Sequence, residues 1–418
     1  MNRVVITGVG AVTPVGNDAE ASWEGMKAGR SGVQRIDYYD VGSFPVQIAG
    51  ICSDFELSQL PDPQAARYLH RGERFGVAAA AEALEHAGCE PGTYPAHDTG
   101  VAIGGSVARP ELQEFSDAFA VRKQSEGHEL HRFPPMQTLQ NSQNTACVEI
   151  ARMAGADGPM IGVSTACTAS AHAIGEAYRL IQEGEVTMMV AGGYDALTSW
   201  CDVLGFSLLG ALTTEYNDDP ERASRPFDKD RSGFVLGEGG VVMILEEQAA
   251  AEARGARILA EVRGYGSSLN AYRMTDPPPD GGGAVIAMNA ALREAGLEPK
   301  DVDYVVAHAT STPAGDISET VAIQRVFGDQ LDRILVTSPK SMTGHTTCAA
   351  SALNLLAGLG AMRDGVVSPT INVDNQDPEC ALDCVANVAR EAEVNVVVVN
   401  GFAFGGTNGA LCVARYEG

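Results

Sequence analysis

The chain is expected to fold as an α/β protein, and two features of the sequence carry this prediction. Short runs rich in β-branched residues alternate with longer Ala-rich stretches, which is typical of strands that alternate with helices. The pattern restarts near Ala256, so the two parts of the chain resemble each other. With 418 residues, of which 45% are hydrophobic and 20% charged, the chain can bury a large core without disulfides or metal ions.

The first half begins with a strand and a helix. The apolar run Val4–Thr7 predicts a buried strand, and Asn17 or Asp18 can cap the helix that follows. Helices are expected at Ala19–Ala28, Gly76–His86 and Ala169–Glu183. Further strands are expected at Val101–Ile103, Met160–Val163, Thr187–Ala191 and Gly240–Leu245.

The second half repeats this alternation. Strands are expected at Ile258–Tyr265, Tyr304–Ala307, Leu335–Ser338, Val394–Asn400 and Ala410–Ala414. Helices are expected at Gly283–Ala295, Ser318–Phe327 and Ala349–Met362. In each half one strand leads through a short polar turn into a helix of small residues. This similarity indicates a duplication joined near Gln248–Arg257, with halves at 1–250 and 251–418.

Charge and cysteine content exclude several classes of protein. The chain has 29 Lys and Arg against 54 Asp and Glu, a net charge of −25, which argues against a generally basic nucleic-acid binder. Nine Cys, an odd number without zinc spacing, argue against a disulfide framework or a metal site. Thr7 and Thr13 interrupt the apolar N-terminus, which we therefore interpret as a strand and loop rather than a signal peptide.

Two further absences narrow the prediction. No apolar run reaches the roughly 18 residues of a membrane-spanning helix, so we expect a soluble cytoplasmic protein without a membrane partner. Two Gly-rich segments, at 232–240 and 405–409, lack the Gly-Lys-Ser/Thr ending of a phosphate loop and do not open a helix after the first strand. They are interpreted as tight turns where backbones approach closely.

Cys167 is the first candidate for chemistry. It lies at the turn between the strand Met160–Val163 and the helix Ala169–Glu183. A thiol at a helix N-terminus lies near the positive end of the helix dipole, so its pKa is expected to fall. The alternative is a buried, inert cysteine, which is the usual state of a free cysteine.

His308 and His345 are the next candidates. His308 ends a predicted strand and enters a polar loop, and His345 precedes an Ala-rich helix whose dipole favours a neutral imidazole. The alternative for each is a structural histidine. One cysteine and two loop histidines suit thioester chemistry: the thiolate holds an acyl group, and two donors stabilise the enolate formed when a second acyl unit loses CO₂. Backbone N–H groups at Cys167 and in the C-terminal Gly-rich loop can form an oxyanion hole.

Motifs along nearly the whole chain resemble those of the elongating β-ketoacyl-acyl carrier protein synthases, closest to synthase II, in the thiolase superfamily. They are VVITGVGAVTPVGN at the start, STACTAS around Cys167, SRPFDKDRSGFVLGEGG (224–240), MTDPPPDGGG (274–283), HATSTPAGD (308–316), SPKSMTGH (338–345) and NGFAFGGTNGAL (400–411). The resemblance implies a thiolase-like, duplicated, five-layer αβαβα fold and a dimer.

The resemblance also implies roles for individual residues. It implies a catalytic triad of Cys167, His308 and His345. The resemblance further implies that Lys340 and Glu319 form a supporting pair and that Asp316 holds the loop after His308. It implies that Phe404 gates the acyl pocket and shares the oxyanion hole with the Cys167 N–H. It also implies that five residues contact substrate: Thr310, Thr312, Thr275, Phe206 and Val107. No separate cofactor is implied, because the substrates are carried on the phosphopantetheine of acyl carrier protein.

Three segments depart from the family pattern. Thr346–Ser351 stands where the family usually has a Leu-Leu-Gly-Ala-Ala-Gly-like run, and Ala108-Arg109-Pro110 stands where glycine is more usual. Glu126–Gln140 lacks the usual aromatic, proline-spaced pattern. These differences affect the expected acyl length and substrate, and not the expected reaction type.

An acidic carrier protein docking on an acidic enzyme needs a local cationic patch. Arg67, Arg71 and Arg74 share a helical face by their spacing, and Arg122, Lys123 and Arg132 can extend that patch. The alternative is an ordinary solvated face.

The expected activity is therefore decarboxylative Claisen condensation of a Cys-bound acyl chain with malonyl-acyl carrier protein, in fatty-acid or polyketide elongation. One alternative is a ketosynthase subunit that works only as a heterodimer with a chain-length factor in type II polyketide synthesis. Two others are a non-catalytic scaffold subunit and an acyltransferase or decarboxylase that stops before condensation. The presence of Cys167, His308, His345 and Lys340 argues against the scaffold.

Overall fold

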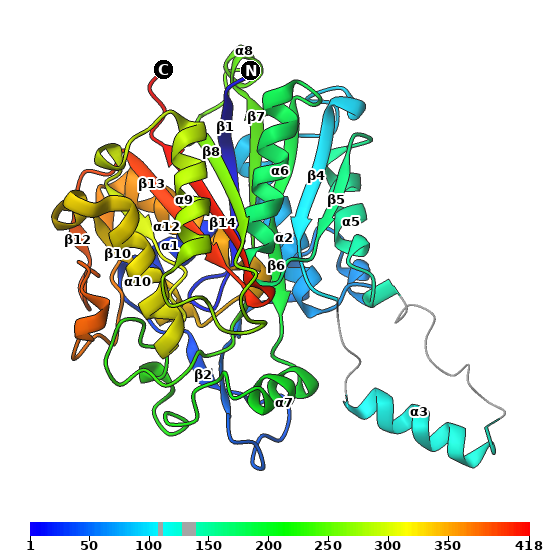
Figure 1. The fold of residues 1–418 in the computed structure, drawn as a ribbon. Coiled ribbons are helices and arrows are strands. Elements are labelled where there is room, and N and C mark those ends of the chain that lie inside the picture. Colours follow the sequence, from blue (N-terminus) through cyan, green and yellow to red (C-terminus); the bar gives the residue numbers. More distant parts are fainter. Residues whose placement is uncertain (108–111, 128–138) are drawn as a thin grey trace.

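A mixed ten-stranded sheet runs through the molecule (Figure 1). The computed structural model describes residues 1–107, 112–127 and 139–418. Across the sheet the strands are β10 (Leu335–Thr337), β9 (Tyr304–Val306), β13 (Val396–Phe402), β14 (Thr407–Ala414), β8 (Ala260–Leu269), β1 (Val4–Val12), β7 (Glu238–Glu247), β6 (Met188–Ala196), β4 (Thr99–Gly104) and β5 (Met160–Val163).

The strand order repeats about the centre of this sheet. From the centre outward, one half reads β1-β7-β6-β4-β5 and the other β8-β14-β13-β9-β10. Both halves have the same pattern, in which two antiparallel pairings are followed by two parallel ones. The halves meet where Val4–Ile6 of β1 pairs antiparallel with Ala260–Val262 of β8. The division into domains at 1–250 and 251–418 remains a prediction, and this repeated order supports it.

Helices cover both faces of each half of the sheet. Side chains on successive strand residues point to opposite faces, so Met189 and Ala191 of β6 join the central core while Met188 and Val190 join an outer one. The central core holds α6 (Ala169–Glu183) and α12 (Ala350–Asp364). The outer cores hold α2 (Arg71–Ala87) with α5 (Asn144–Ala154), and α9 (Gly282–Ala295) with α10 (Pro313–Phe327). The layers are therefore outer helices, one half of the sheet, the central helices, the other half of the sheet and outer helices. This is the αβαβα order of the predicted thiolase-like fold.

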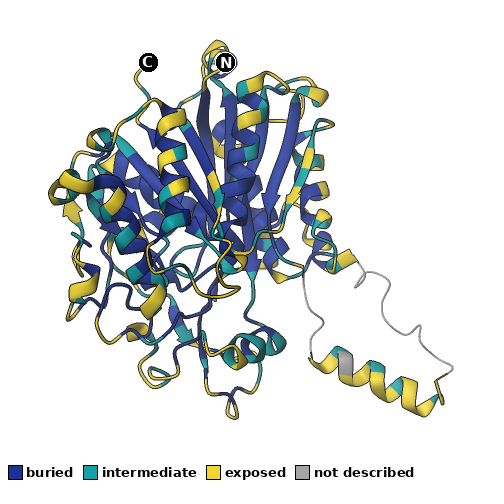
Figure 2. Cartoon of the chain, viewed as in Figure 1, coloured by how far each residue is buried: buried dark blue, intermediate teal, exposed yellow. Residues whose placement is uncertain are grey.

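The middle layer explains the composition of its helices. In α12 every residue from Ala350 to Met362 is buried, so the helix lacks a polar face. Figure 2 shows the same contrast across the molecule: the strands and central helices are buried, and the outer helices expose one side.

Alternating glycines set the distance between strand and outer helix in both halves. A Cβ at Gly10 of β1 would lie 2.0 Å from the Ala79 carbonyl oxygen of α2, and one at Gly266 of β8 would lie 2.0 Å from the Ala287 carbonyl oxygen of α9. Only glycine allows such close packing of backbones. The strand β1 runs to Val12, whereas the sequence predicted that it ends at Thr7, because residues 8–12 also pair with β7.

Several elements escaped prediction. They are the helices α3 (Leu112–Gln124), α5, α7 (Trp200–Leu208), α8 (Gln248–Ala253) and α11 (Lys340–Thr343), and the two-stranded pairs β2 (Val33–Arg35) with β3 (Ile48–Gly50) and β11 (Val366–Val367) with β12 (Arg390–Glu391). A helix α1 (Ala19–Lys27) follows β1 as predicted, capped by Asp18. Figure 1 shows α3 away from the body of the chain, while α7 lies below the sheet.

The close strand–helix packing leads to a stability prediction. Gly10→Val should lower the free energy of unfolding by about 1–3 kcal/mol or more, because the added carbons meet the backbone of α2. Gly42→Ala is the matched control, since its Cβ would meet only the flexible Asp40 side chain at 3.1 Å. Urea unfolding of both variants measures the difference, and equal stability would contradict this account of the packing.

Candidate active site

Cys167 lies where the backbone turns from β5 into α6. The turn is a short 3-10 segment, Ala166–Thr168, in which Ala166 has a positive φ of 50°. This conformation strains the backbone of a non-glycine residue, and such strain is common at functional sites. The Thr165 carbonyl oxygen accepts a hydrogen bond from the Thr168 hydroxyl at 2.7 Å, which holds the turn. The thiol is partly exposed to a cavity of about 660 Å³.

Two histidines from the second half reach the same cavity. His308 follows β9, and His345 follows α11 through Gly344. The Nε2 atom of His345 lies 3.0 Å from the Sγ of Cys167, although 178 positions separate the two residues. The rings of His308 and His345 lie 5.3 Å apart at 83°. The fold therefore brings together the three residues that the resemblance implied as a triad.

Burial decides the protonation of the thiol. It raises the pKa of Cys167 to about 12, and the charge of Lys340 and the backbone N–H groups of Cys167 and Phe404 oppose this rise. The expectation that the helix N-terminus lowers this pKa is wrong, because loss of hydration outweighs it. Cys167 is therefore a thiol at neutral pH, and its sulfur could act as a nucleophile only if its proton passed to a neighbouring base.

Both histidines are neutral. Burial lowers the pKa of His308 and of His345 well below the usual value, and the charge of Lys340 lowers both further. Their Nδ1 atoms are buried and have no hydrogen-bond partner among the described residues. A neutral imidazole can donate one N–H and accept at its other nitrogen, so each ring suits proton transfer or stabilisation of an oxyanion.

Glu319 of α10 fixes the start of the loop after β9. Its carboxylate accepts the backbone N–H of His308 at 2.8 Å and that of Ala309 at 2.6 Å. Asn400 of β13 donates to the same carboxylate at 2.9 Å. Asn400 was not assigned this role from the sequence, although it begins the motif NGFAFGGTNGAL.

Lys340 and Glu319 interact through charge and not through a direct bond. Lys340 is buried, and its Nζ has no hydrogen-bond partner among the described residues. Burial lowers the pKa of Lys340 to about 8, and the negative charge of Glu319 is the main opposing influence. The ammonium group is therefore free to act electrostatically on both histidines and on Cys167.

Asp316 holds the loop that carries His308 and Thr310. It accepts the backbone N–H groups of Thr310 and Phe227, each at 3.0 Å. Arg231 lies 3.5 Å from the Asp316 carboxylate, and burial raises the pKa of Asp316 to about 6 against the effect of that arginine.

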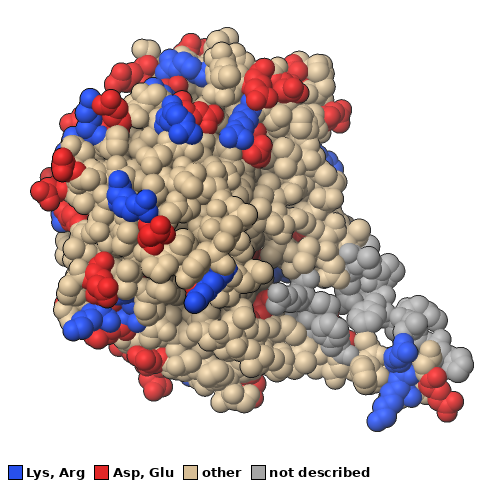
Figure 3. All heavy atoms as spheres, viewed as in Figure 1, with Lys and Arg blue, Asp and Glu red and all other residues tan. Residues whose placement is uncertain are grey.

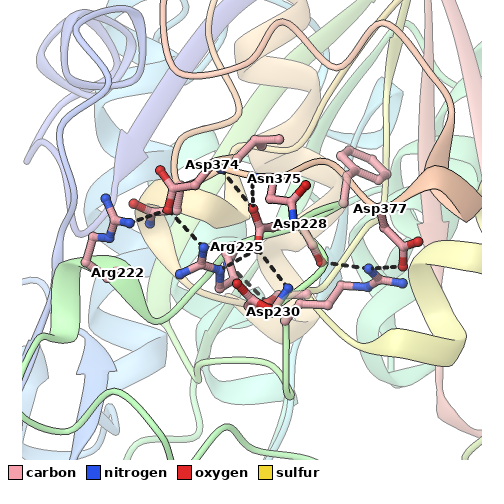
Figure 4. Close-up of polar contacts among 12 residues, drawn as sticks. Arg222, Arg225, Asp228, Asp230, Asp374, Asn375 and Asp377 are labelled. Atoms are coloured by element: carbon pink, nitrogen blue, oxygen red, sulfur yellow. Dashed lines mark hydrogen bonds and ion pairs between the residues drawn. The ribbon is translucent and has the colours of Figure 1, made fainter.

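Arg231 extends this support into a partly buried network, whose other members named here are labelled in Figure 4. It donates to Asp377 at 2.7 Å, while Asp228 pairs with Arg225 and accepts the backbone N–H groups of Asp374 and Asn375 at 2.8 Å each. The network connects the motif SRPFDKDRSGF to the histidine loop and to residues 374–377. The sequence revealed this motif but not that it supports the loop that carries His308.

Asp195, at the end of β6, anchors the segment after His345. Its carboxylate accepts from Ser106 Oγ at 2.5 Å, from the Thr347 hydroxyl and from the Cys348 N–H at 3.1 Å. This part of the departure at Thr346–Ser351 is thus held by a buried carboxylate. Sequence reasoning missed Asp195, because its partners lie far away in the chain.

Aromatic side chains form one wall of the site. The ring of Phe234 lies 5.5 Å from that of His345, 6.4 Å from that of Phe404 and 5.9 Å from that of Phe206. Phe404 occupies a tight turn before Gly405, whose φ is +82°, a conformation that favours glycine.

Four of the five predicted substrate contacts line the cavity. They are Thr310, Thr312, Thr275 and Phe206. Thr310 and Thr312 place their hydroxyl oxygens 3.1 Å apart. Val107 does not line the cavity, because β4 has already ended at Gly104 and half of this side chain is exposed. Its neighbour Ser106 takes that place.

The predicted helical patch of arginines is wrong. Arg67 belongs to a 3-10 turn, Pro63–Arg67, and α2 begins only at Arg71, so the three arginines share no helical face. Arg71 is paired with the buried Glu238 at 2.5 Å, and Arg74 donates to the carbonyl oxygens of Leu69 and Ala66. Of these three guanidinium groups, that of Arg67 has the fewest internal contacts.

The remaining predicted cations and departures all fall between residues 108 and 140 of the sequence. Arg122 and Lys123 are exposed on α3. Arg132, Ala108-Arg109-Pro110 and most of Glu126–Gln140 fall outside the described residues. Within the described ranges, His, Cys, Asp and Glu side chains form no group able to hold a metal ion, and no helix has the length and hydropathy to cross a membrane.

Comparison with known families follows the same two halves. The family description "Beta-ketoacyl synthase, N-terminal domain" matches residues 1–251, and "Beta-ketoacyl synthase, C-terminal domain" matches residues 259–374.

Curated relatives match over almost the whole chain. A 3-oxoacyl-[acyl-carrier-protein] synthase 2 of Vibrio cholerae is 41% identical over 415 residues, which is 99% of each chain. One of Coxiella burnetii is 41% identical over 414 residues, covering 99% of this chain and 98% of its own.

Solved structures agree. A β-ketoacyl synthase from Burkholderia phymatum has a TM-score of 0.89 at 34% identity and full coverage of both chains. A type II polyketide ketosynthase, solved in complex with its acyl-carrier protein, has a TM-score of 0.89 at 30% identity over 99% of this chain and all of its own. By fold, sequence and the residues that meet at Cys167, this chain belongs to the β-ketoacyl synthase family.

Proposed function

We propose that this protein is a β-ketoacyl-acyl carrier protein synthase that elongates fatty acyl chains by decarboxylative Claisen condensation with malonyl-acyl carrier protein. The observation that carries the proposal is the 3.0 Å contact between Cys167 Sγ and His345 Nε2 inside a cavity that also holds His308. The relatives named as 3-oxoacyl-acyl carrier protein synthase 2 support the same reaction.

In the first half-reaction Cys167 takes the acyl group. The Sγ atom attacks the carbonyl carbon of the acyl thioester, and His345 Nε2 accepts the thiol proton. The N–H groups of Cys167 and Phe404, which already act on the sulfur, stabilise the carbonyl oxygen as it becomes negative. The carbon–sulfur bond to the carrier's pantetheine breaks, and the proton passes to that departing sulfur.

In the second half-reaction the malonyl group loses CO₂. The two electrons of the broken carbon–carbon bond form an enolate, whose oxygen His308 and His345 stabilise as neutral hydrogen-bond donors. Burial keeps both rings neutral, and the charge of Lys340 adds to this effect. The enolate carbon attacks the acyl carbon on Cys167, the carbon–sulfur bond to Cys167 breaks, and its electron pair leaves on the sulfur. The resulting thiolate takes up a proton from solvent, which restores the thiol.

The supporting residues have proposed positioning roles. Glu319 and Asp316 hold the His308 loop through backbone hydrogen bonds. Phe404 is proposed as the gate, and Thr310, Thr312, Thr275 and Phe206 as substrate contacts. We propose no metal or separate cofactor, because the substrates arrive on the phosphopantetheine of acyl carrier protein, and we propose that the enzyme acts in the cytoplasm.

We also propose that the chain works as a dimer. The strand β5 is an edge of the sheet and ends in the turn that carries Cys167, and it is only partly covered, with Met160 exposed. An uncovered edge strand is a natural surface for pairing with a second chain. That second chain is a copy of this one for fatty-acid elongation, or a chain-length-factor-like subunit for type II polyketide synthesis.

Mass of the intact protein tests the nucleophile. After incubation with an acyl-acyl carrier protein thioester, the wild type should gain the mass of one acyl group, and Cys167→Ala should gain none. Cys89→Ala, which removes a buried thiol outside the cavity, should still be acylated. Cys167→Gln should abolish condensation and retain malonyl decarboxylation. Acylation of Cys167→Ala would show that another group is the nucleophile.

The pH dependence of condensation tests Lys340. Its positive charge lowers both histidine pKa values, so Lys340→Ala should raise them and move the acidic limb of the kcat/KM profile to higher pH. The exposed Lys229→Ala is the control. An unchanged acidic limb in Lys340→Ala would contradict this electrostatic role.

Turnover by the purified chain tests self-sufficiency. A homodimeric elongation enzyme should condense acyl and malonyl carrier thioesters alone, and size-exclusion chromatography with light scattering should give twice the mass of the chain. An inactive chain that gains activity only with a chain-length-factor-like partner would instead support the heterodimer.

A further inference from the structure

The buried side of the Cys167 cavity is polar. Four residues line it there, and we call them the polar wall: Ser106, Asp195, Thr347 and Cys348. Asp195, Thr347 and Cys348 are only 0%, 4% and 3% exposed. Met274, which lines the same cavity on its solvent side, is 75% exposed. The polar wall therefore lies at the inner end of the cavity, away from the side by which a substrate enters.

The segment of Thr347 and Cys348 repeats the turn that carries Cys167. Ala166 and Thr347 have positive φ angles of 50° and 42°, and each begins a short 3-10 turn whose next residue is a cysteine. Each turn leads into a helix of 15 residues, α6 or α12, and the two turns contact each other. A β-branched residue rarely adopts this strained conformation, which is found mostly at functional sites. The Thr347 turn thus borders the space beside the Cys167 sulfur.

Asp195 fixes the hydrogen atoms of the polar wall. Most acidic side chains visible in Figure 3 lie around the margins of that face, where water surrounds them, but Asp195 is fully buried. Its Oδ1 atom accepts from the Ser106 hydroxyl at 2.5 Å and from the Ala196 backbone N–H at 3.0 Å. Its Oδ2 atom accepts from the Thr347 hydroxyl and from the Cys348 backbone N–H. A carboxylate has about four acceptor positions, so those of Asp195 are filled.

The two hydroxyl groups consequently present acceptors to the cavity. A hydroxyl has one hydrogen and two lone pairs, and both Ser106 and Thr347 give their hydrogen to Asp195. Among the residues that the structure describes, neither hydroxyl oxygen accepts a hydrogen bond. A ligand that suits the polar wall therefore brings a hydrogen-bond donor. An alkyl chain would remove water from both oxygens and offer no hydrogen bond in return, which is unfavourable.

We propose that the polar wall is a subsite for a hydroxyl group on the acyl chain, so that the enzyme extends 3-hydroxyacyl chains in preference to saturated ones. The inference rests on the proposed function and specifies its acyl substrate. Condensation leaves a keto group on the third carbon of the product, and reduction of that group gives a hydroxyl on the same carbon. The reaction that supplies the substrate is then a ketone reduction that is not followed by loss of water.

Competition for Cys167 tests this subsite. The protein is mixed with equal amounts of the 3-hydroxyoctanoyl and octanoyl thioesters of N-acetylcysteamine, and intact mass separates the two adducts, which differ by one oxygen atom. One enantiomer of the hydroxyacyl thioester should react about fivefold faster, the ratio that one net hydrogen bond produces. Thr347→Val and Ser106→Ala each remove a hydroxyl, so each should bring this ratio below about twofold. Thr99→Val is the matched control and should keep the ratio, since it changes a buried threonine at the far end of β4, outside the cavity.

Equal rates for the two thioesters in the wild type, or an unchanged ratio in both variants, would overturn the subsite. If Thr347→Val does not fold, Ser106→Ala alone decides. Binding to Cys167→Ala separates the subsite from the chemistry: calorimetry should show about fivefold tighter binding of 3-hydroxyoctanoic acid than of octanoic acid. Equal affinities would also count against the subsite. A wild type that gains no adduct from either thioester would instead contradict the proposed function.

Discussion

The site depends on the close contact between the N-terminal ends of α6 and α12 in the middle layer. These two helices come from the two halves of the chain, and the short 3-10 turns that lead into them are Ala166–Thr168, which holds Cys167, and Thr347–Ala349, which follows His345. The backbone N–H of Ala352 donates to Ser170 Oγ at 3.1 Å, which ties the helices together directly. Small side chains at these positions make the approach sterically allowed, and the 3.0 Å contact from Cys167 to His345 follows from it.

Burial in this middle layer sets the electrostatics of the site. Removing water raises the pKa of the thiol and lowers those of both histidines, so the uncharged forms of these three groups are favoured. Burial also lowers the pKa of Lys340, but only to about 8, so its ammonium group keeps its charge at neutral pH. The reaction can use this condition, because a neutral imidazole both accepts the thiol proton and donates to an oxyanion. The fold compensates for buried charges elsewhere by pairing them, as in the network of Arg231, Asp316 and Asp377.

The two halves share a framework and divide the chemistry. Both use the same strand order and the same packing of strand glycines against helix alanines. The first half supplies the proposed nucleophile Cys167 and Asp195, while the second supplies both histidines, Lys340 and Glu319. Polar contacts then cross between the halves, as when Asp195 of β6 accepts from Thr347 and Cys348. An active site of this kind requires both halves to be folded and correctly packed against each other.

Local pattern was enough to predict the α/β class and most strands and helices, because periodicity and turns are encoded within short windows. For Cys167, His308 and His345 it only named candidates, and the family motifs supplied the prediction that the three act together. Local pattern could not predict the pKa of Cys167, the partners of Arg71 and Arg74, the place of Val107 or the role of Asp195. Those properties depend on burial and on residues distant in the chain. Hydration and long-range contacts depend on how the folded halves pack around the cavity, so only the tertiary structure determines them.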